Sequence, residues 1–129
     1  MSITSRKPFK VIITGAASFS RYAVLSAKCR KILARKMADA QTEVVVISGC
    51  YSGAELLGMQ WASENGLRVM LHTIGTGLSF ADGETDRCRR MLQDADALIA
   101  FDWPPYPNRH MIRLIDGARQ KGIPYRVID

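Results

Sequence analysis

The sequence contains a short turn of small residues between an apolar run and a helical segment. In this turn, Gly49 and Gly53 would let the backbone turn tightly and approach a ligand. The amides that open the next helix would attract an anion, with help from the helix dipole. Ser48 and Ser52 add hydroxyl groups, and Cys50 lies in the same turn. Alternatively, the turn needs its glycines only for steric reasons.

This glycine pattern is not one of the common nucleotide motifs. The sequence has neither GxxxxGK[ST] nor GxGxxG, so it supports neither a nucleoside-triphosphatase P-loop nor a dinucleotide fingerprint.

Acidic residues near strand ends could supply a catalytic group. Glu55 and Asp102 are the candidate catalytic residues, because a carboxylate there could activate water or stabilise a developing positive charge. Asp102 could instead cap the loop that follows it. His110 could act as an acid or base, or could cap the helix that it opens. The sequence alone does not choose among these roles.

Strands and helices must alternate to position these residues. Strand-like apolar runs cover residues 9–15, 43–49, 67–74, 96–102 and 124–129. Between them, apolar stripes with helical spacing lie in residues 22–33, 54–61, 88–95 and 111–118. The sequence therefore predicts an α/β fold, a Rossmann-like open parallel five-stranded sheet in the order 3-2-1-4-5, with helices on both faces.

Such a sheet binds ligands beyond the carboxyl ends of its strands, at the switch between the first and fourth strands. We expect the loops after the first, second and fourth strands to meet there. The segment 75–84 is predicted to be a long loop, either a lid over the ligand or an irregular connection. Trp103 and Tyr106 would form an exposed aromatic platform that stacks a base or joins two subunits.

Composition restricts the class of protein. The 129 residues carry a formal charge of +6, which favours anionic partners, although many of these charges would simply solvate helix surfaces. Three cysteines without CxxC spacing argue against disulfides and zinc, and we expect neither a metal nor a cofactor. No apolar run could span a membrane, so we expect a cytoplasmic protein with no membrane partner. We expect a single domain over residues 1–129, with 1–8 as a flexible tail.

Four segments together resemble a known family: VIITGAASFSRYAVL, VVISGCYSGAELLGMQWASENGL, DRCRRMLQDADALIAF and HMIRLIDGARQKGIPYRVID. In this order and spacing they resemble the YspA-like branch of the SLOG superfamily, which also contains the LOG phosphoribohydrolases and the DNA-processing protein DprA. The resemblance covers about residues 10–129. Its most specific part, residues 48–66, is similar to the family pattern S-G-G-A-x-G-A-D-x-L-x-x-x-W-A-x-x-x-G.

The resemblance implies a Rossmann-like domain that binds nucleotides or nucleotide derivatives. The ligand-binding residues expected from this resemblance and from the predicted strand ends are Gly15, Ala16, Ser18, Ser48, Gly49, Cys50, Ser52, Gly53, Glu55, Arg87, Asp102, Asn108 and Arg109. Glu55 replaces the aspartate of the pattern and could still bind a ribose hydroxyl or a backbone amide.

The sequence also departs from the family. Ala16, Ala17 and Ser18 stand where the family commonly has Ser-Arg-Asp, and DWPPYPNRH replaces the PGGxGT phosphate loop of the LOG enzymes. Since prolines remove backbone donors, an anion in this last loop would have to be held by Asn108, Arg109 and the helix start.

The sequence supports three functional hypotheses. The first is a cytoplasmic domain that binds a nucleotide or nucleotide derivative, as a ligand sensor. The alternatives are a LOG-like phosphoribohydrolase and a DprA-like nucleic-acid-binding module. The basic charge supports the last of these, which we rank below a small-molecule partner. By resemblance to proteins of this fold, we also expect a homodimer.

Overall fold

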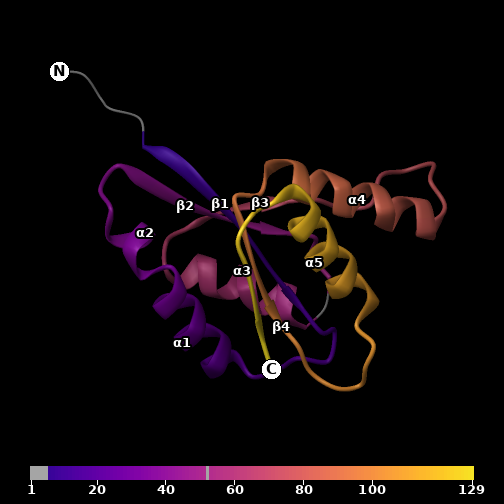
Figure 1. Cartoon of the computed structure of the whole chain (residues 1–129), viewed down its shortest axis with the longest axis horizontal. Helices are drawn as coiled ribbons and strands as arrows, with labels where there is room; N and C mark the ends of the chain where they lie inside the picture. The colour runs from indigo at the N-terminus through magenta and orange to yellow at the C-terminus, as the bar shows by residue number, and fades with distance from the viewer. Residues whose placement is uncertain (1–5, 52) are drawn as a thin grey trace.

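Five parallel strands form one sheet in the order β3-β2-β1-β4-β5 (Figure 1). This sheet is seen in a computed structural model that describes residues 6–51 and 53–129. The strands are β1 (Lys7–Gly15), β2 (Thr42–Ser48), β3 (Arg68–Leu71), β4 (Ala97–Phe101) and β5 (Tyr125–Ile128). The predicted fold class and strand order are therefore confirmed.

The central strands are longer and more buried than the edge strands. In β1 the last five residues are buried, and β2 is buried from Val44 to its end, as expected for strands covered on both faces. In contrast, β3 pairs only with β2, over four residues. The sequence predicted a strand over 67–74, and the observed β3 is shorter because β2 ends at Ser48, opposite Leu71.

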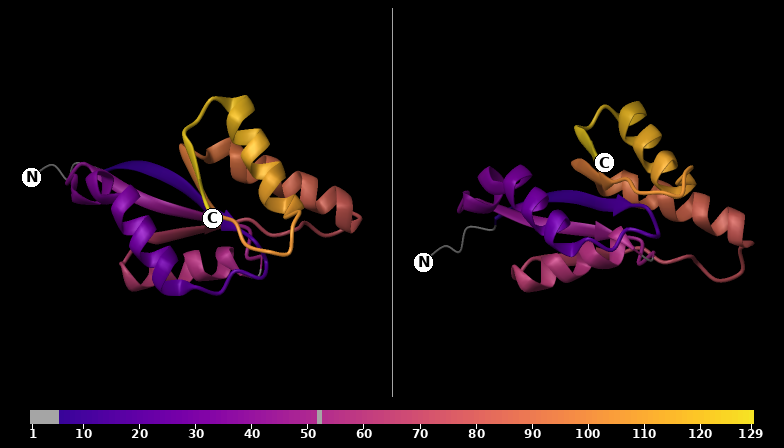
Figure 2. Two further views of the ribbon diagram at one scale, coloured as in Figure 1. Left: turned by 60° about the horizontal axis from the view of Figure 1, so that its bottom comes forward. Right: turned by 90° about the horizontal axis from the view of Figure 1, so that it is seen from below.

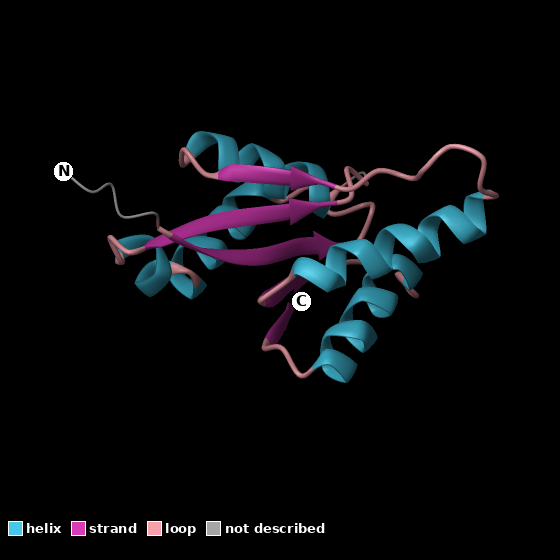
Figure 3. Ribbon diagram, turned by 90° about the horizontal axis from the view of Figure 1, so that it is seen from above, coloured by secondary structure: helices cyan, strands magenta, loops and turns pink. Residues whose placement is uncertain are grey.

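Helices cover both faces of the sheet, as Figures 2 and 3 show. They are α1 (Tyr22–Ile32), α2 (Ala34–Ala38), α3 (Ala54–Glu64), α4 (Phe80–Asp94) and α5 (Arg109–Lys121). Alternate residues of β1 point to opposite faces. Val11 and Ile13 belong to the core beneath α1 and α3, whereas Ile12 belongs to the core beneath α4 and α5. Among the described residues, no helix is both long and apolar enough to cross a bilayer.

The beginning of α4 differs from the expectation. The segment 75–84 was predicted to be a loop, but α4 already begins at Phe80. The side chain of Ser79 accepts a hydrogen bond from the Asp82 amide at 3.2 Å and so caps the helix. The exposed connection is therefore shorter than predicted.

The neighbouring strands β1 and β4 lead to opposite faces of the sheet. Gly15 lies beside Phe101 in the ladder, and the Ala16 amide still donates to the Phe101 carbonyl at 2.9 Å. Beyond this point, one chain enters α1 and the other enters α5, on different faces. The predicted switch point is therefore present at the carboxyl ends of β1 and β4.

Candidate functional site

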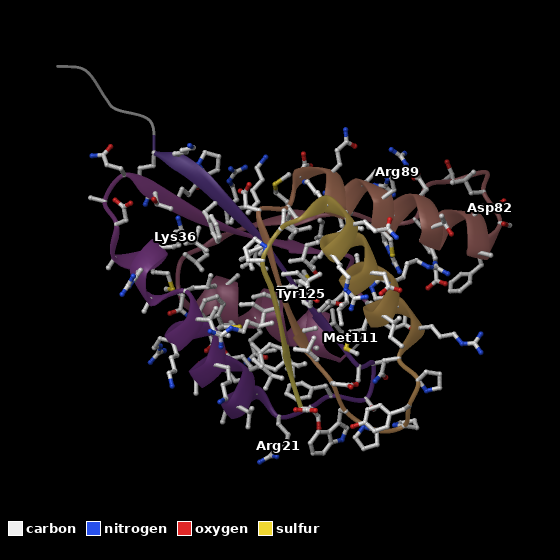
Figure 4. All side chains as sticks on the ribbon, in the orientation of Figure 1. Arg21, Lys36, Asp82, Arg89, Met111 and Tyr125 are labelled. Carbon is white, nitrogen blue, oxygen red and sulfur yellow. The ribbon has the colours of Figure 1, made fainter. Side chains whose placement is uncertain are left out.

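A crevice of about 410 Å³ lies at the switch point. It is lined by Gly15, Ala17 and Ser18 after β1, by Pro105 and Pro107 after β4, by residues 108–111 at the start of α5, and by Tyr51, Phe80 and Glu84. Figure 4 shows Met111 inside the molecule at this end of α5, whereas Asp82 and Arg89 lie along the outside of α4. The three loops that were expected to meet at the crevice therefore all contribute to it.

The N-terminal end of α5 borders the crevice. Asn108 is the residue before the helix, but its side chain makes no cap bond. Instead, it donates to the Asp102 carboxylate and to the Trp103 carbonyl. The first-turn residues line the crevice, and the Arg109 side chain adds a positive charge there. This helix start can therefore attract an anion through its dipole and its side chain.

The loop after β2 is closed by Glu55, which is fully buried. Glu55 Oε1 accepts from the amides of Gly49 and Tyr51, both at 3.1 Å. The Cys50 amide donates to Ser48 Oγ at 3.1 Å. Side chains of the protein itself therefore bind the amides of this turn, whereas the prediction placed an anion on the amides that open the next helix.

Gly53 has a steric role in the same loop. Its φ of 73° lies in the left-handed region, and a Cβ atom there would collide with the carbonyl oxygens of Ala16 and Ala17. The Ala54 amide donates to the Ala16 oxygen at 3.3 Å, so the two loops are in direct contact. The glycine therefore lets the loop after β2 pack on the loop after β1, which is the steric alternative considered for this turn.

His110 forms a buried ion pair with Glu55, at 2.6 Å between Nε2 and Oε2. Burial alone would lower the pKa of His110, but its contacts with Cys88 and Glu55 outweigh burial and raise the pKa to about 9. For Glu55, burial alone would raise the pKa, yet His110, Thr14 and the Tyr51 amide together lower it. Both groups are therefore stabilised in their charged forms.

This arrangement corrects two expectations. Glu55 was a candidate for catalysis and for ribose binding, but its carboxylate is buried and its oxygens accept bonds from Thr14, His110 and two amides. His110 was considered as a helix cap, but its side chain is only 7% exposed and binds Glu55. The two residues are 55 positions apart in the chain, and only the fold brings them together.

Arg87 lies behind the crevice wall. It is 6% exposed, and its Nη1 donates to the Gly49 carbonyl at 3.3 Å. Its guanidinium lies 5.8 Å from the Tyr51 ring centre, and its Nη2 lies 3.7 Å from Glu84. The Nε and Nη2 atoms have no hydrogen-bond partner among the described residues. Tyr51 and Glu84 thus separate a buried cation with spare donors from the crevice.

Asp102 acts on its own loop. Its Oδ1 accepts from the Trp103 amide at 2.9 Å and from the Asn108 side chain. Asp102 therefore caps the loop, the alternative that was left open for it. Trp103 is half-buried and packs edge-on against Phe19, with ring centres 6.1 Å apart, while Tyr106 is 60% exposed. Only the second of these aromatic residues is exposed as predicted.

The structure divides the predicted site residues into two groups. Gly15, Ser18, Asn108 and Arg109 line the crevice. Buried beneath it are Ala16, Ser48, Gly49, Glu55 and Arg87, whereas Gly53 and Asp102 are half-buried and Cys50 is exposed outside it. Ser52 lies outside the described residues. Phe80 was not predicted, because no motif or spacing distinguishes it; Tyr51 belongs to a loop that was expected at the site, and Glu84 is one of the acids near the strand ends, but neither was selected as a binding residue.

The comparisons with known proteins agree with this fold. A solved structure of DNA processing protein A (DprA) from Streptococcus pneumoniae superposes with a TM-score of 0.54 at 13% identity. The match covers 92% of this chain but 58% of that one, and at this identity it shows the fold alone. No curated protein matches the sequence significantly.

A family model provides a closer assignment. The model of the YspA, cpYpsA-related SLOG family matches residues 9–74, which is just over half of the chain. The matched part runs from β1 through β3 and includes the loop closed by Glu55. Both the sequence match and the observed strand order support one assignment: the chain belongs to the YspA, cpYpsA-related SLOG family.

Proposed function

We propose that this protein binds a nucleotide or nucleotide-derived small molecule in the crevice at the switch point. Membership of the SLOG family is compatible with such a ligand. The crevice volume of about 410 Å³ falls within the roughly 300–1,000 Å³ typical of small-molecule pockets. We further propose that the chain acts as one binding domain. A homodimer and a cytoplasmic location stay predictions from sequence.

The observation that carries this proposal is the start of α5 at the crevice wall. Residues 108–111 line the crevice, so the positive end of a 13-residue helix lies beside it. Arg109 adds a full positive charge, and Ser18 adds a hydroxyl group. A phosphate group placed here would receive both backbone and side-chain donors.

Aromatic side chains supply a second kind of contact. Tyr51 and Phe80 line the same crevice, and Phe80 is 69% exposed. A planar base could stack on either ring while its phosphate lies near Arg109. One crevice therefore offers an apolar planar surface and an anion site, which is the combination that a nucleotide requires.

The phosphoribohydrolase alternative has weaker support. Glu55 is buried and already paired, and Asp102 caps its own loop. Among the described residues that line the crevice, Glu84 alone carries a carboxylate, and it lies 3.7 Å from Arg87. The nucleic-acid alternative depends on the positive charge and on the fold shared with DprA, and neither points to a particular surface.

A thermal-shift experiment with AMP, ADP, ADP-ribose, adenosine and inorganic phosphate tests the proposal. A ligand at ten times its Kd should stabilise the protein by about 1.4 kcal/mol, which raises Tm by roughly 5 °C. Phosphorylated compounds should produce the shift and adenosine should not. The absence of a shift with every phosphorylated compound would contradict the proposal.

Two matched arginine variants locate the site. Arg109→Ala removes the charge at the crevice and should abolish the shift. Arg119→Ala removes an exposed arginine at the other end of α5 and should leave the shift unchanged. Equal loss in both variants would indicate a general charge effect and would argue against the crevice as the site.

A further inference from the structure

Three side chains from different elements form a line beneath the crevice. Cys88 Sγ on α4 lies 3.7 Å from His110 Nδ1 on α5. The other ring nitrogen of His110 lies 2.6 Å from Glu55 Oε2 on α3. A thiol, an imidazole and a carboxylate are thus in contact in the order nucleophile, base and orienting acid.

Glu55 fixes the orientation of the imidazole. Its carboxylate accepts hydrogen bonds from Thr14 Oγ1 at 2.7 Å and from two backbone amides. Because the carboxylate is ionised, it carries no proton that it could donate to His110. His110 Nε2 must therefore carry a proton toward Glu55. The lone pair of Nδ1 then faces the sulfur of Cys88 and can accept the thiol proton, which produces the imidazolium form that Glu55 stabilises.

A second cavity gives access to the sulfur. Cys88 lines a groove of about 830 Å³ between α4 and α5, whose walls include Leu92 and Ile112. Cys88 itself is only 2% exposed. A reagent that reaches its sulfur must therefore be little larger than a water molecule.

The other two cysteines differ from Cys88 in their surroundings. Cys29 is fully buried in the core on the opposite face of the sheet, and burial raises its pKa to about 12. Cys50 is exposed on the loop after β2. Among the described residues, only Cys88 has a histidine nitrogen within contact distance of its sulfur.

We propose that Cys88 is a modification site for hydrogen peroxide, with His110 as the base. The thiol proton moves to His110 Nδ1, and the sulfur attacks one peroxide oxygen. A sulfur–oxygen bond forms, the oxygen–oxygen bond breaks, and the departing hydroxide takes the proton from His110 to become water. Sulfur is oxidised to the sulfenic acid and peroxide is reduced, so that the thiol and peroxide yield sulfenic acid and water.

The position of Cys88 limits the fate of its sulfenic acid. Cys29 belongs to the core on the other face of the sheet, so it cannot form a disulfide with Cys88 without unfolding. A disulfide between these two cysteines is therefore not available to the sulfenic acid in the folded chain. The Tyr51 ring stacks on His110, with centres 5.0 Å apart, so a change at Cys88 would be transmitted to a residue of the crevice wall.

The test treats the folded protein with dilute hydrogen peroxide, removes the peroxide, and then unfolds the protein in the presence of dimedone, which traps sulfenic acids, for peptide mass spectrometry. Cys88 should be oxidised at least about tenfold faster than Cys29, and this advantage should disappear when the peroxide is added in urea, where His110 no longer faces the sulfur. Equal labelling of Cys88 and Cys29 in the folded protein, or an advantage that persists in urea, would overturn the proposal. These measurements need no variant and no nucleotide, so their result is independent of the proposed function.

Two histidine variants then test the base. His110→Gln keeps a donor for Glu55 but removes the nitrogen that accepts the thiol proton, and it should slow labelling of Cys88 about tenfold or more. His72→Gln changes the other histidine, which contacts Arg90 and Asp94 instead of a cysteine, and should leave the rate unchanged. An unchanged rate in folded His110→Gln protein would show that the base is not needed and would refute the mechanism.

Discussion

The loop after β2 and the start of α5 both bring backbone amides to the carboxyl edge of the sheet, but they use them differently. In the first region, the amides of Gly49 and Tyr51 bind the buried Glu55 carboxylate. In the second, residues 108–111 line a crevice, and the side chain before the helix turns away to Asp102. One region is closed by an anion of the protein itself, and the other faces a cavity.

This difference shows what decides whether such a turn binds a ligand. A glycine-rich turn supplies donors whether or not a ligand binds it, but a carboxylate six residues after Gly49 already accepts two of them. The start of α5 has no glycine and three nearby prolines, yet it reaches the crevice. The occupancy of the donors, and not the glycine spacing, separates the closed region from the open one.

Removing the Glu55 carboxylate from the loop after β2 should have the largest effect on the free energy of unfolding. Glu55→Ala leaves the His110 charge buried and two amides without their acceptor, so we expect a loss of about 3–5 kcal/mol in the free energy of unfolding. Urea denaturation measures this loss. Glu43→Ala, which breaks the more exposed pair with Arg68, is the control and should cost less than about 1 kcal/mol. Similar losses in the two variants would show that burial of the Glu55 carboxylate adds nothing to stability.

The same ion pair should make stability depend on pH. The pKa of His110 rises from 6.5 to about 9 on folding, so its contribution is complete below 6.5 and disappears as pH rises through about 9. At about 1.4 kcal/mol per pH unit, the loss is about 3 kcal/mol. The lowered pKa of Glu55 gives the opposite dependence, with stability lost as pH falls below about 4.5.

Urea denaturation between pH 6 and about 10 measures this dependence, and His110→Gln should flatten it. The comparison of variants is needed because the raised pKa of Cys29 also destabilises the folded state above its ordinary value of 9. A wild-type curve that is parallel to that of His110→Gln would exclude the ion pair as the source.

Removing the acidic side chain of Glu84 should increase the affinity of the crevice for an anion. Glu84→Gln deletes a negative charge from the crevice and leaves Arg87 without its ionic partner, so an anion should bind more tightly. We expect up to about a tenfold decrease in the Kd for inorganic phosphate, about 1.4 kcal/mol, measured by calorimetry. Asp86→Asn removes an acid that pairs with Arg89 and Arg90 on the same helix and should not change the affinity. Weaker binding in Glu84→Gln would contradict this picture of the crevice.

The smallest effect is expected at the contact between the loops after β1 and β4. Ser18 Oγ donates to the Pro104 carbonyl at 2.7 Å across the mouth of the crevice. Ser18→Ala should cost about 0.5–1.5 kcal/mol in urea denaturation. Ser20→Ala, at an exposed position two residues away, should stay within about 0.5 kcal/mol of the wild type. A larger loss in Ser20→Ala than in Ser18→Ala would show that the loop contact does not stabilise the crevice.

The sequence was sufficient for the sheet because burial on both faces leaves a direct pattern. The runs predicted to end at Gly15 and Gly49 are nearly continuous in apolar residues, and they form the central strands β1 and β2. The limits of β3 and α4 were less accurate. They depend on a single neighbouring strand and on the Ser79 cap, which are contacts that hydrophobic spacing does not contain.

The site was only partly predictable. Asn108 and Arg109 could be placed near the switch because they follow a central strand. The pairing of Glu55 with His110 could not, because it joins the first turns of helices that lie on different faces of the sheet. The motif around Gly49 indicated donors correctly, but a local pattern does not show which side chain folds back to occupy them.

The Glu55–His110 contact also couples the motions of two helices on opposite faces of the sheet. It ties α3 in one helical layer to α5 in the other, at the rim where the layers are otherwise separated by the sheet. A tie of this kind couples the opening of the two layers, so the amides at the starts of both helices should exchange their hydrogens with deuterium at similar rates. Loss of the Glu55–His110 ion pair would let the starts of α3 and α5 open independently of each other.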